Sequence, residues 1–201
     1  HTFVYTNSND TNAFAMRVRN GFEAAAKEYG VKLICLDNKQ DAVQANANAD
    51  QAITQKVDFY FQYNTDAEVN NLIGKKLDDN GIKAIAIQVP MAIGETGEAF
   101  PFYGVSNYGS GFTCGESLAN AAIKKWGKGE DYLMFTMGFP EAGALFQDRA
   151  AGANDGVKSL FPEIDIIESS SEDNVDTARQ RTTDFLAANP DGKILIWSHA
   201  D

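Results

Sequence analysis

An apolar strand, a polar loop and an amphipathic helix recur about every 25 to 30 residues along this 201-residue chain. Strands that alternate with helices predict a parallel sheet with covered faces, because a crossover helix joins parallel neighbours most directly. Ligands of such sheets bind outside the carboxyl ends of the strands, so functional residues are expected in the loops that follow them. The predicted strands are residues 2–7, 31–36, 57–62, 83–88, 102–106, 132–137, 164–168 and 194–197.

Helices are predicted between these strands, where apolar residues recur at steps of three and four. In the first helix these residues are Phe14, Val18, Phe22, Ala25 and Tyr29. The predicted helices are residues 12–29, 43–56, 67–80, 111–126, 147–160 and 175–189. A Pro- and Gly-containing link at residues 90–100 interrupts the series. The chain is therefore predicted to form two doubly wound, parallel-sheet α/β lobes, residues 1–107 and 108–201.

The net charge of −11 and the isoelectric point near 4.6 argue against a nucleic acid or an anionic membrane as a partner. Both partners require Lys and Arg to neutralise phosphate. No apolar run approaches the roughly 18 residues of a membrane span. A small-molecule ligand is therefore expected. The chain opens at the edge of its first strand, so we expect that a preceding segment such as a signal peptide has been removed.

The histidines and cysteines predict neither a metal site nor a disulfide. His1 and His199 lie at opposite ends of the chain, and neither has a second ligand at the spacing that a metal needs. Cys35 lies within a predicted strand, and Cys114 lies near the start of a predicted helix. Both are predicted to be buried thiols that pack as small hydrophobic groups.

The segment from Gly109 to Gly115 follows a strand and opens a helix, as a dinucleotide-binding glycine loop would. The next strand, however, ends without an acidic residue to hold a ribose hydroxyl, and the loop after the first strand contains no glycine. The glycines are therefore interpreted as marking a hinge and a helix start. The chain also lacks a serine elbow, a phosphate-binding loop and a nucleophile–base pair. The sequence predicts a protein that is not an enzyme and that needs no cofactor or metal.

A series of short motifs runs in order along the whole chain. The motifs are Asn12-x-Phe14, Asn20-Gly21-Phe22, Ala25-Ala26, Tyr29-Gly30-Val31, Val57-Asp58, Tyr63-Asn64-Thr65-Asp66, Gly81-Ile82, Gly104-Val105-Ser106-Asn107, Arg149-x-x-Gly152, Asp176-Thr177-Ala178, Pro190-Asp191 and His199-Ala200-Asp201. In this order they resemble the periplasmic sugar-binding proteins related to the ribose- and galactose-binding proteins. The resemblance implies two lobes that close on a sugar or polyol and deliver it to the permease of an ABC importer. It also implies a monomer in the periplasm or outside the cell, with a lipid anchor to the cell surface as one option.

The same resemblance implies a set of ligand-binding residues. Asn12 would hydrogen-bond sugar hydroxyls, and Phe14 would stack on one face of the ring. Gln88 lies where relatives carry a polar sugar ligand, and its amide offers both a donor and an acceptor. Arg149 matches an arginine that holds sugar oxygens from the second lobe. Asp10 and Asp201 complete the predicted set.

Each of these residues also has a structural interpretation that the sequence leaves open. Asn12 fits the N-cap of a helix, and Phe14 fits the start of an apolar helix face. Gln88 fits a capped strand end, and Arg149 fits a surface position on a helix. The sequence also departs from the family where Val89 follows the predicted ligand Gln88, where Val175 replaces an aromatic residue and where Ala200 replaces an asparagine.

The family continues past residue 201, so we expect this sequence to be a fragment of a chain nearer to 300 residues. Two other functions remain as alternatives. One is the ligand-sensing effector domain of a LacI-type transcriptional repressor, which requires an upstream DNA-binding head. The other is an α/β nucleotide-dependent enzyme that uses the glycine loop.

Overall fold

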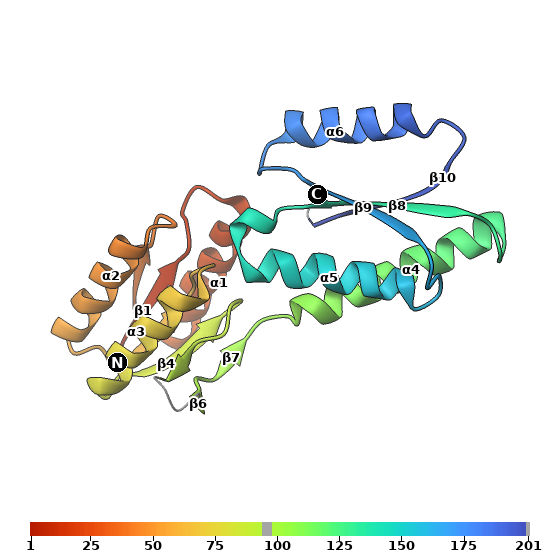
Figure 1. Ribbon diagram of the computed structural model, residues 1–201. Coiled ribbons are helices and arrows are strands. Elements are labelled where there is room, and N and C mark those ends of the chain that lie inside the picture. Colours follow the sequence, from red (N-terminus) through yellow and green to blue (C-terminus); the bar gives the residue numbers. More distant parts are fainter. Residues whose placement is uncertain (94–97, 200–201) are drawn as a thin grey trace. The chain divides into compact units, whose positions relative to one another are not determined.

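The computed structural model describes residues 1–93 and 98–199, which form parts of two compact units, His1–Gly104 and Val105–Asp201. Figure 1 shows parallel strands and covering helices in each unit. The predicted α/β class with parallel sheets is confirmed. The lobe boundary predicted after residue 107 falls inside a helix that begins at Asn107, whereas the two units divide between Gly104 and Val105.

Unit 1 contains a five-stranded parallel sheet in the order β2-β1-β3-β4-β7. Its strands are β1 (Thr2–Asn7), β2 (Lys32–Asp37), β3 (Phe59–Gln62), β4 (Lys83–Ile87) and β7 (Phe102–Tyr103). Its helices are α1 (Ala13–Tyr29), α2 (Ala42–Thr54) and α3 (Ala67–Asp79). A short antiparallel pair, β5 (Ala92–Ile93) and β6 (Glu98–Ala99), follows β4 and lies in the predicted irregular link.

Successive side chains of β1 point to opposite faces of the sheet, so the core of unit 1 forms one cluster on each face. Val4 packs with Ala49 of α2 and Ile73 of α3 in one cluster. The next residue, Tyr5, packs with Ala15 of α1 in a second cluster on the opposite face. Helices therefore cover both faces, as a doubly wound sheet requires.

Helix α1 begins and ends at residues whose chemistry fits those positions. The Asn12 Oδ1 accepts the backbone N–H of Ala15 at 3.0 Å, and Gly30 adopts a left-handed φ of 65° just beyond the last turn. The predicted apolar face is only partly correct, because Phe14 and Tyr29 are 53% and 77% exposed. The helix instead packs through Ala15, Val18 and Phe22, so its buried face is rotated and short.

Unit 2 contains a three-stranded parallel sheet in the order β10-β8-β9. Its strands are β8 (Tyr132–Gly138), β9 (Asp165–Ser170) and β10 (Lys193–Ser198). Its helices are α4 (Asn107–Trp126), α5 (Ala144–Lys158) and α6 (Val175–Ala188), with a 3-10 turn at Pro140–Ala142. Figure 1 shows α4 and α5 on one side of these strands and α6 on the other.

Helices α4 and α5 pack backbone against backbone through glycines. A Cβ added to Gly111 or Gly115 of α4 would lie less than 3.0 Å from a backbone carbonyl oxygen of α5. Gly152 and Gly156 of α5 meet carbonyl oxygens of α4 in the same way. These glycines are therefore required for close packing rather than for a hinge or for helix punctuation.

The structure corrects three predictions at and around α4. Helix α4 begins at Asn107 rather than at residue 111, because the Ser106 Oγ accepts the Gly109 N–H at 3.1 Å and caps the helix there. Strand β7 therefore ends at Tyr103 rather than at Ser106. Cys114 is exposed, because the glycine face of α4 turns that side chain away from α5, whereas Cys35 is half-buried in the core beside α1.

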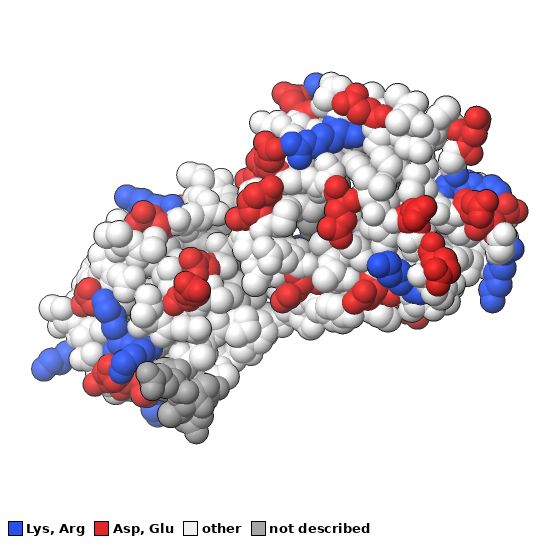
Figure 2. Space-filling model, viewed as in Figure 1, with Lys and Arg blue, Asp and Glu red and all other residues white. Residues whose placement is uncertain are grey.

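Charged groups are dispersed over the face of the molecule that Figure 2 shows. Figure 2 shows acidic side chains distributed over the visible face, where Lys and Arg form no continuous patch outside the grey residues. Within the described residues, no helix has the length and apolar character to cross a membrane.

We predict that alanine has opposite effects at two helical glycines. Gly115→Ala should lower the free energy of unfolding by about 1–3 kcal/mol, because the new methyl group meets the Ala153 carbonyl. Gly21→Ala should raise it by about 0.5–1 kcal/mol, because Gly21 lies within α1 and has no atom within 4 Å of the added Cβ. Urea denaturation of both variants measures this difference. Equal effects would contradict the backbone packing of α4 on α5.

Candidate functional site

The carboxyl ends of the unit 1 strands form a polar edge. Asn7 ends β1, Gln62 ends β3, and Gln88 follows β4. Because these strands are parallel neighbours, the loops that follow them leave the same edge of the sheet. Asn7 and Gln62 are fully buried, whereas Gln88 is half-buried. This edge contains four of the predicted ligand residues: Asp10, Asn12, Phe14 and Gln88.

Asn12 and Phe14 lie at the N-terminus of α1. The capping bond to Ala15 uses the amide oxygen of Asn12, so its NH2 group is the part that a ligand hydroxyl could bond. The structural and functional interpretations of Asn12 are therefore compatible. Phe14 is 53% exposed and is not a core residue, which leaves its ring available for stacking in unit 1.

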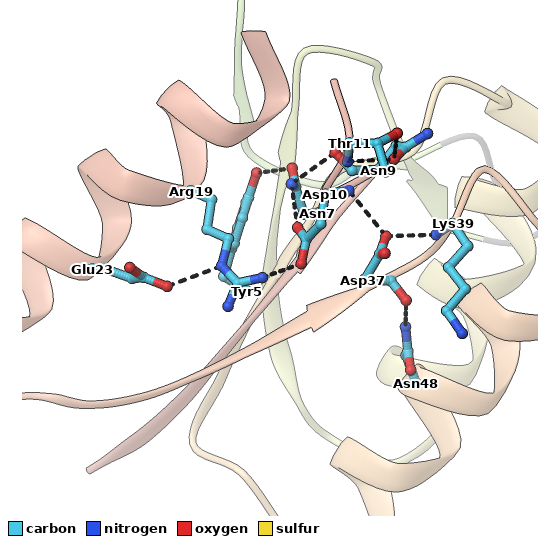
Figure 3. Close-up of polar contacts among 10 residues, drawn as sticks. All are labelled: Tyr5, Asn7, Asn9, Asp10, Thr11, Arg19, Glu23, Asp37, Lys39 and Asn48. Carbon is cyan, nitrogen blue, oxygen red and sulfur yellow. Dashed lines mark hydrogen bonds and ion pairs between the residues drawn. The ribbon is translucent and has the colours of Figure 1, made fainter. Parts of the chain in front are cut away.

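Asp10 lies in the loop between β1 and α1, where it forms contacts within the protein (Figure 3). Its Oδ1 accepts the Asn7 Nδ2–H at 2.7 Å, and its Oδ2 pairs with the Arg19 guanidinium. Its backbone N–H donates to the Asp37 carboxylate at 3.3 Å. The predicted ligand residue Asp10 thus has an internal partner for each carboxylate oxygen.

Gln88 adopts a left-handed backbone conformation that glycine normally occupies. Its φ is 64°, and the N–H of Val89 donates to the Ile87 carbonyl at 2.8 Å, which closes a three-residue γ-turn. The Gln88 N–H donates to the Tyr103 carbonyl of β7 at 2.9 Å. A non-glycine residue in such a conformation stores strain, which proteins concentrate at functional sites.

A chain of buried amides supports this turn from inside the sheet. The Thr6 hydroxyl donates to Gln62 Oε1 at 2.7 Å, and Gln62 Nε2–H donates to Asn70 Oδ1 at 3.0 Å. Asn70 Nδ2–H then donates to the Val89 carbonyl at 3.4 Å. Thr6, Gln62 and Asn70 are all fully buried. The network therefore connects β1, β3 and α3 to the residue that follows Gln88.

Arg149 lies on α5 in unit 2 and is held by two polar contacts. One terminal nitrogen donates to the Asn107 Oδ1 at 2.7 Å, and the other donates to the His199 carbonyl at 3.1 Å. Its Nε is buried and has no hydrogen-bond partner among the described residues. Arg149 is therefore an oriented, half-buried guanidinium rather than a freely exposed surface arginine.

A pocket of about 360 Å³ opens in unit 2 near the carboxyl ends of β8 and β9. Its walls combine apolar and polar groups from Thr136, Gly138, Pro140, Phe146, Gln147, Ala150, Ala151, Glu168, Ser169 and Ser170. Beneath it, the Thr136 hydroxyl donates to the Asn154 Oδ1 at 2.7 Å, and Asn154 donates to Glu168. Ser170 donates to Glu141 at 2.7 Å, which lowers the pKa of the Glu141 carboxyl.

The structure brings four of the six predicted ligand residues to one edge of unit 1 and places Arg149 in unit 2. Asp201, the sixth, lies outside the described residues, as does Ala200. The resemblance to sugar-binding proteins also implies that Arg149 and Gln88 reach a common cleft between the lobes, and this stays a prediction. Sequence reasoning missed Arg19, Asn7 and Gln62. The signal available for the last two was a polar side chain at the end of an otherwise apolar strand.

No group of three or more His, Cys, Asp or Glu side chains in residues 1–93 and 98–199 has the arrangement of a metal site. Burial raises the pKa of the Cys35 thiol to about 11, so this cysteine is a poor nucleophile at neutral pH. Burial also raises the pKa of Tyr5, which keeps its hydroxyl protonated as a donor to Asn7.

Comparison with protein families gives a match to the periplasmic binding protein domain over residues 3–201. Similar solved structures include an ABC transporter periplasmic solute binding protein from Actinobacillus succinogenes with bound D-allose. Its TM-score is 0.82 at 22% identity, over 100% of this chain and 69% of that chain. A Caulobacter myo-inositol binding protein has a TM-score of 0.76 at 20% identity, over 94% of this chain and 62% of that chain.

A third structure is a carbohydrate transporter solute binding protein from Agrobacterium radiobacter in complex with D-arabinose. Its TM-score is 0.74 at 22% identity, and the match covers 98% of this chain and 66% of that chain. At these identities the likeness establishes the fold. No curated protein sequence matches this chain. By the coverages given above, this chain spans about two thirds of the length of the three solved proteins.

The turn at Gln88 predicts that a glycine variant is more stable there than an alanine variant. Gln88→Gly should be more stable than Gln88→Ala by about 1 kcal/mol, because only glycine adopts a positive φ without strain. At Arg17, an exposed position in α1, the order should reverse by a similar amount. Urea midpoints of the four variants test this. A Gln88→Ala protein as stable as Gln88→Gly would mean that the turn is unstrained.

The two cysteines should react at different rates. At pH 8 the Cys35 thiol is three pH units below its pKa of about 11, so about one molecule in a thousand carries the reactive thiolate. Its rate should rise roughly tenfold per pH unit up to that pKa, while exposed Cys114 reacts first. Titration with a chromogenic disulfide, with Cys114→Ser as the control, measures both rates. Rapid labelling of the Cys114→Ser protein at pH 8 would contradict the burial of Cys35.

Proposed function

The chain belongs to the periplasmic binding protein family, and on that basis we propose that it captures a monosaccharide or polyol for an ABC importer. Membership of a family of binding proteins supports the prediction that the chain is not an enzyme. The proposed partners are the sugar and the membrane permease that receives it. The proposed location is the periplasm or the cell exterior, where the protein acts as a monomer, with or without a lipid anchor.

The observation that carries this proposal is the pairing of an exposed aromatic ring with amide groups on one sheet edge. A sugar ring has an apolar C–H face and a rim of hydroxyls. Phe14 offers a surface for the face, the NH2 group of Asn12 offers donors for the rim, and the Gln88 amide offers both a donor and an acceptor. The strain held at Gln88 is consistent with a backbone maintained for binding.

The solved relatives support the class of ligand. Three proteins of the same fold were solved with D-allose, myo-inositol and D-arabinose. These ligands share a dense set of hydroxyl groups, for which oriented amides and a guanidinium are suitable partners. By the family's mechanism, closure around such a ligand would produce the shape that a permease recognises.

The full-length natural protein should be tested with a thermal-shift panel of D-allose, D-arabinose, myo-inositol, NAD and ATP. A ligand that binds only the folded state raises the melting temperature, so at least one of the first three should do so. Stabilisation by NAD or ATP and by no sugar or polyol would instead support the nucleotide-dependent enzyme. Calorimetry on any stabilising compound then gives its affinity.

We predict that Arg149→Ala removes roughly 2 kcal/mol or more of sugar-binding free energy, the usual size of a lost charge-assisted hydrogen bond. Arg149→Lys should restore little of it, because an ammonium group cannot reproduce the planar fork of donors. Arg179→Ala is the matched control, since Arg179 is an exposed arginine on α6 of the same unit. Calorimetry with the sugar found in the panel decides the matter. Equal affinities for the wild type and Arg149→Ala would remove Arg149 from the site.

A further inference from the structure

We propose that Arg19 is a positioning residue for ligand binding, and that its pair with Asp10 holds the loop of residues 8–12 in a binding-competent shape. This inference rests on the proposed function, because the loop leads directly into Asn12 and Phe14. It also changes the role of Asp10, which the sequence analysis had counted among the direct ligand contacts. In this proposal Asp10 anchors the loop.

The anchor begins in the buried core of unit 1. The Tyr5 hydroxyl donates to the Asn7 Oδ1 at 2.8 Å, and both residues are fully buried. The Asn7 Nδ2 group donates to the Asp10 Oδ1 at 2.7 Å and to the Asn9 carbonyl at 3.1 Å. The last residue of β1 thus binds the loop that follows it through both donors of one buried amide (Figure 3).

Arg19 closes this chain of contacts from the helix side. Its guanidinium pairs with the second oxygen of Asp10, and its Nε donates to Glu23 Oε1 at 2.9 Å. The side chains of Arg19 and Asp10 are only 24% and 25% exposed, so solvent screens this pair less than a surface pair. Figure 3 shows the guanidinium between Glu23 and Asp10. The pair therefore links the loop to the helix that carries Asn12 at its start.

A carboxylate from β2 constrains the other side of the loop. Asp37 accepts the backbone N–H of Asp10 at 3.3 Å and the backbone N–H of Lys39 at 2.7 Å. Arg19 thus pairs with the carboxylates of Asp10 and Glu23, while the Asp37 carboxylate lies beside the backbone of Asp10. Without Arg19, Asp10 and Glu23 would lose their shared cation, and Asp10 would remain beside Asp37. The loop would then open to separate these charges.

The consequence for binding follows from pre-organisation. A loop that is already ordered loses less entropy when a sugar bonds to Asn12 and stacks on Phe14. Loss of the Arg19–Asp10 pair should therefore lower affinity by roughly tenfold, the effect of one partly buried charged hydrogen bond. The sugar need not touch either residue.

The first test is hydrogen exchange on the ligand-free, full-length protein. In Arg19→Met, backbone amides of residues 8–12 should exchange at least about tenfold faster than in the wild type, while those of β4 remain unchanged. Lys75→Met is the matched control, because Lys75 forms an exposed ion pair with Asp79 on α3 of the same unit. Unchanged exchange of residues 8–12 in Arg19→Met would overturn the proposal whether or not a sugar binds.

The second test is a double-mutant cycle of Arg19→Met and Asp10→Asn, with D-allose, D-arabinose and myo-inositol titrated by calorimetry. Each single variant should weaken binding by roughly tenfold, and the double variant should be no weaker than either. Arg19→Lys should recover part of the affinity, because one ammonium can still pair with Asp10. Independent losses that multiply in the double variant would make Asp10 a direct ligand contact and overturn its assigned role.

Different results would contradict the proposed sugar-binding function and the positioning role of Arg19. Binding of none of the three compounds by the wild type would contradict the proposed function, while hydrogen exchange would still decide whether Arg19 orders the loop. Binding that is unchanged in Arg19→Met, with a loosened loop, would overturn the positioning role and leave the proposed function intact.

Discussion

Parallel pairing of β1 with both β2 and β3 is the constraint on which the candidate site depends. In this arrangement successive strands point the same way, so the loops after β1, β3 and β4 emerge at one edge. Their backbone groups must then find partners beyond the end of the ladder. Buried amides such as Asn7 and Asn70 supply them, since they donate to the backbone carbonyls of Asn9 and Asn64. The polar edge is therefore a structural requirement of this sheet as well as a place where hydroxyl groups can bind.

Much of the fold could be predicted from the sequence, because strand and helix periodicities differ and the three helices of unit 1 begin at recognisable caps. Asn12, Asp41 and Asp66 all cap helices within a residue or two of the predicted starts. The predictions were wrong at the start of α4 and where tertiary contacts, rather than the local sequence, determine which side chains are buried. Helix α4 begins earlier than its glycines suggested, because Ser106 caps it. The glycines instead serve contacts with α5 that no local pattern shows. The exposure of Cys114 follows from the same packing.

The site was only partly predictable for a related reason. The position of Gln88 at a strand end was visible in the sequence, but its left-handed turn and the hydrogen bond from Asn70 to the residue after it were not. The pairing of Asp10 with Arg19 likewise joins a predicted ligand residue to a helix residue to which the sequence analysis gave no role. Long-range polar contacts have no period, so hydrophobic patterning cannot reveal them. The candidate ligand residues came from the resemblance to sugar-binding proteins and not from periodicity.

The central claim is that a sugar binds at the strand ends of unit 1 through Asn12, Phe14 and Gln88. The most direct measurement is a crystal structure of the full-length protein grown with the monosaccharide or polyol that stabilises it most. The account predicts the ring stacked on Phe14, with hydroxyls bonded to the amides of Asn12 and Gln88. A sugar that occupied only the pocket of unit 2 beside Phe146 and Glu168, with no contact to those three residues, would contradict it.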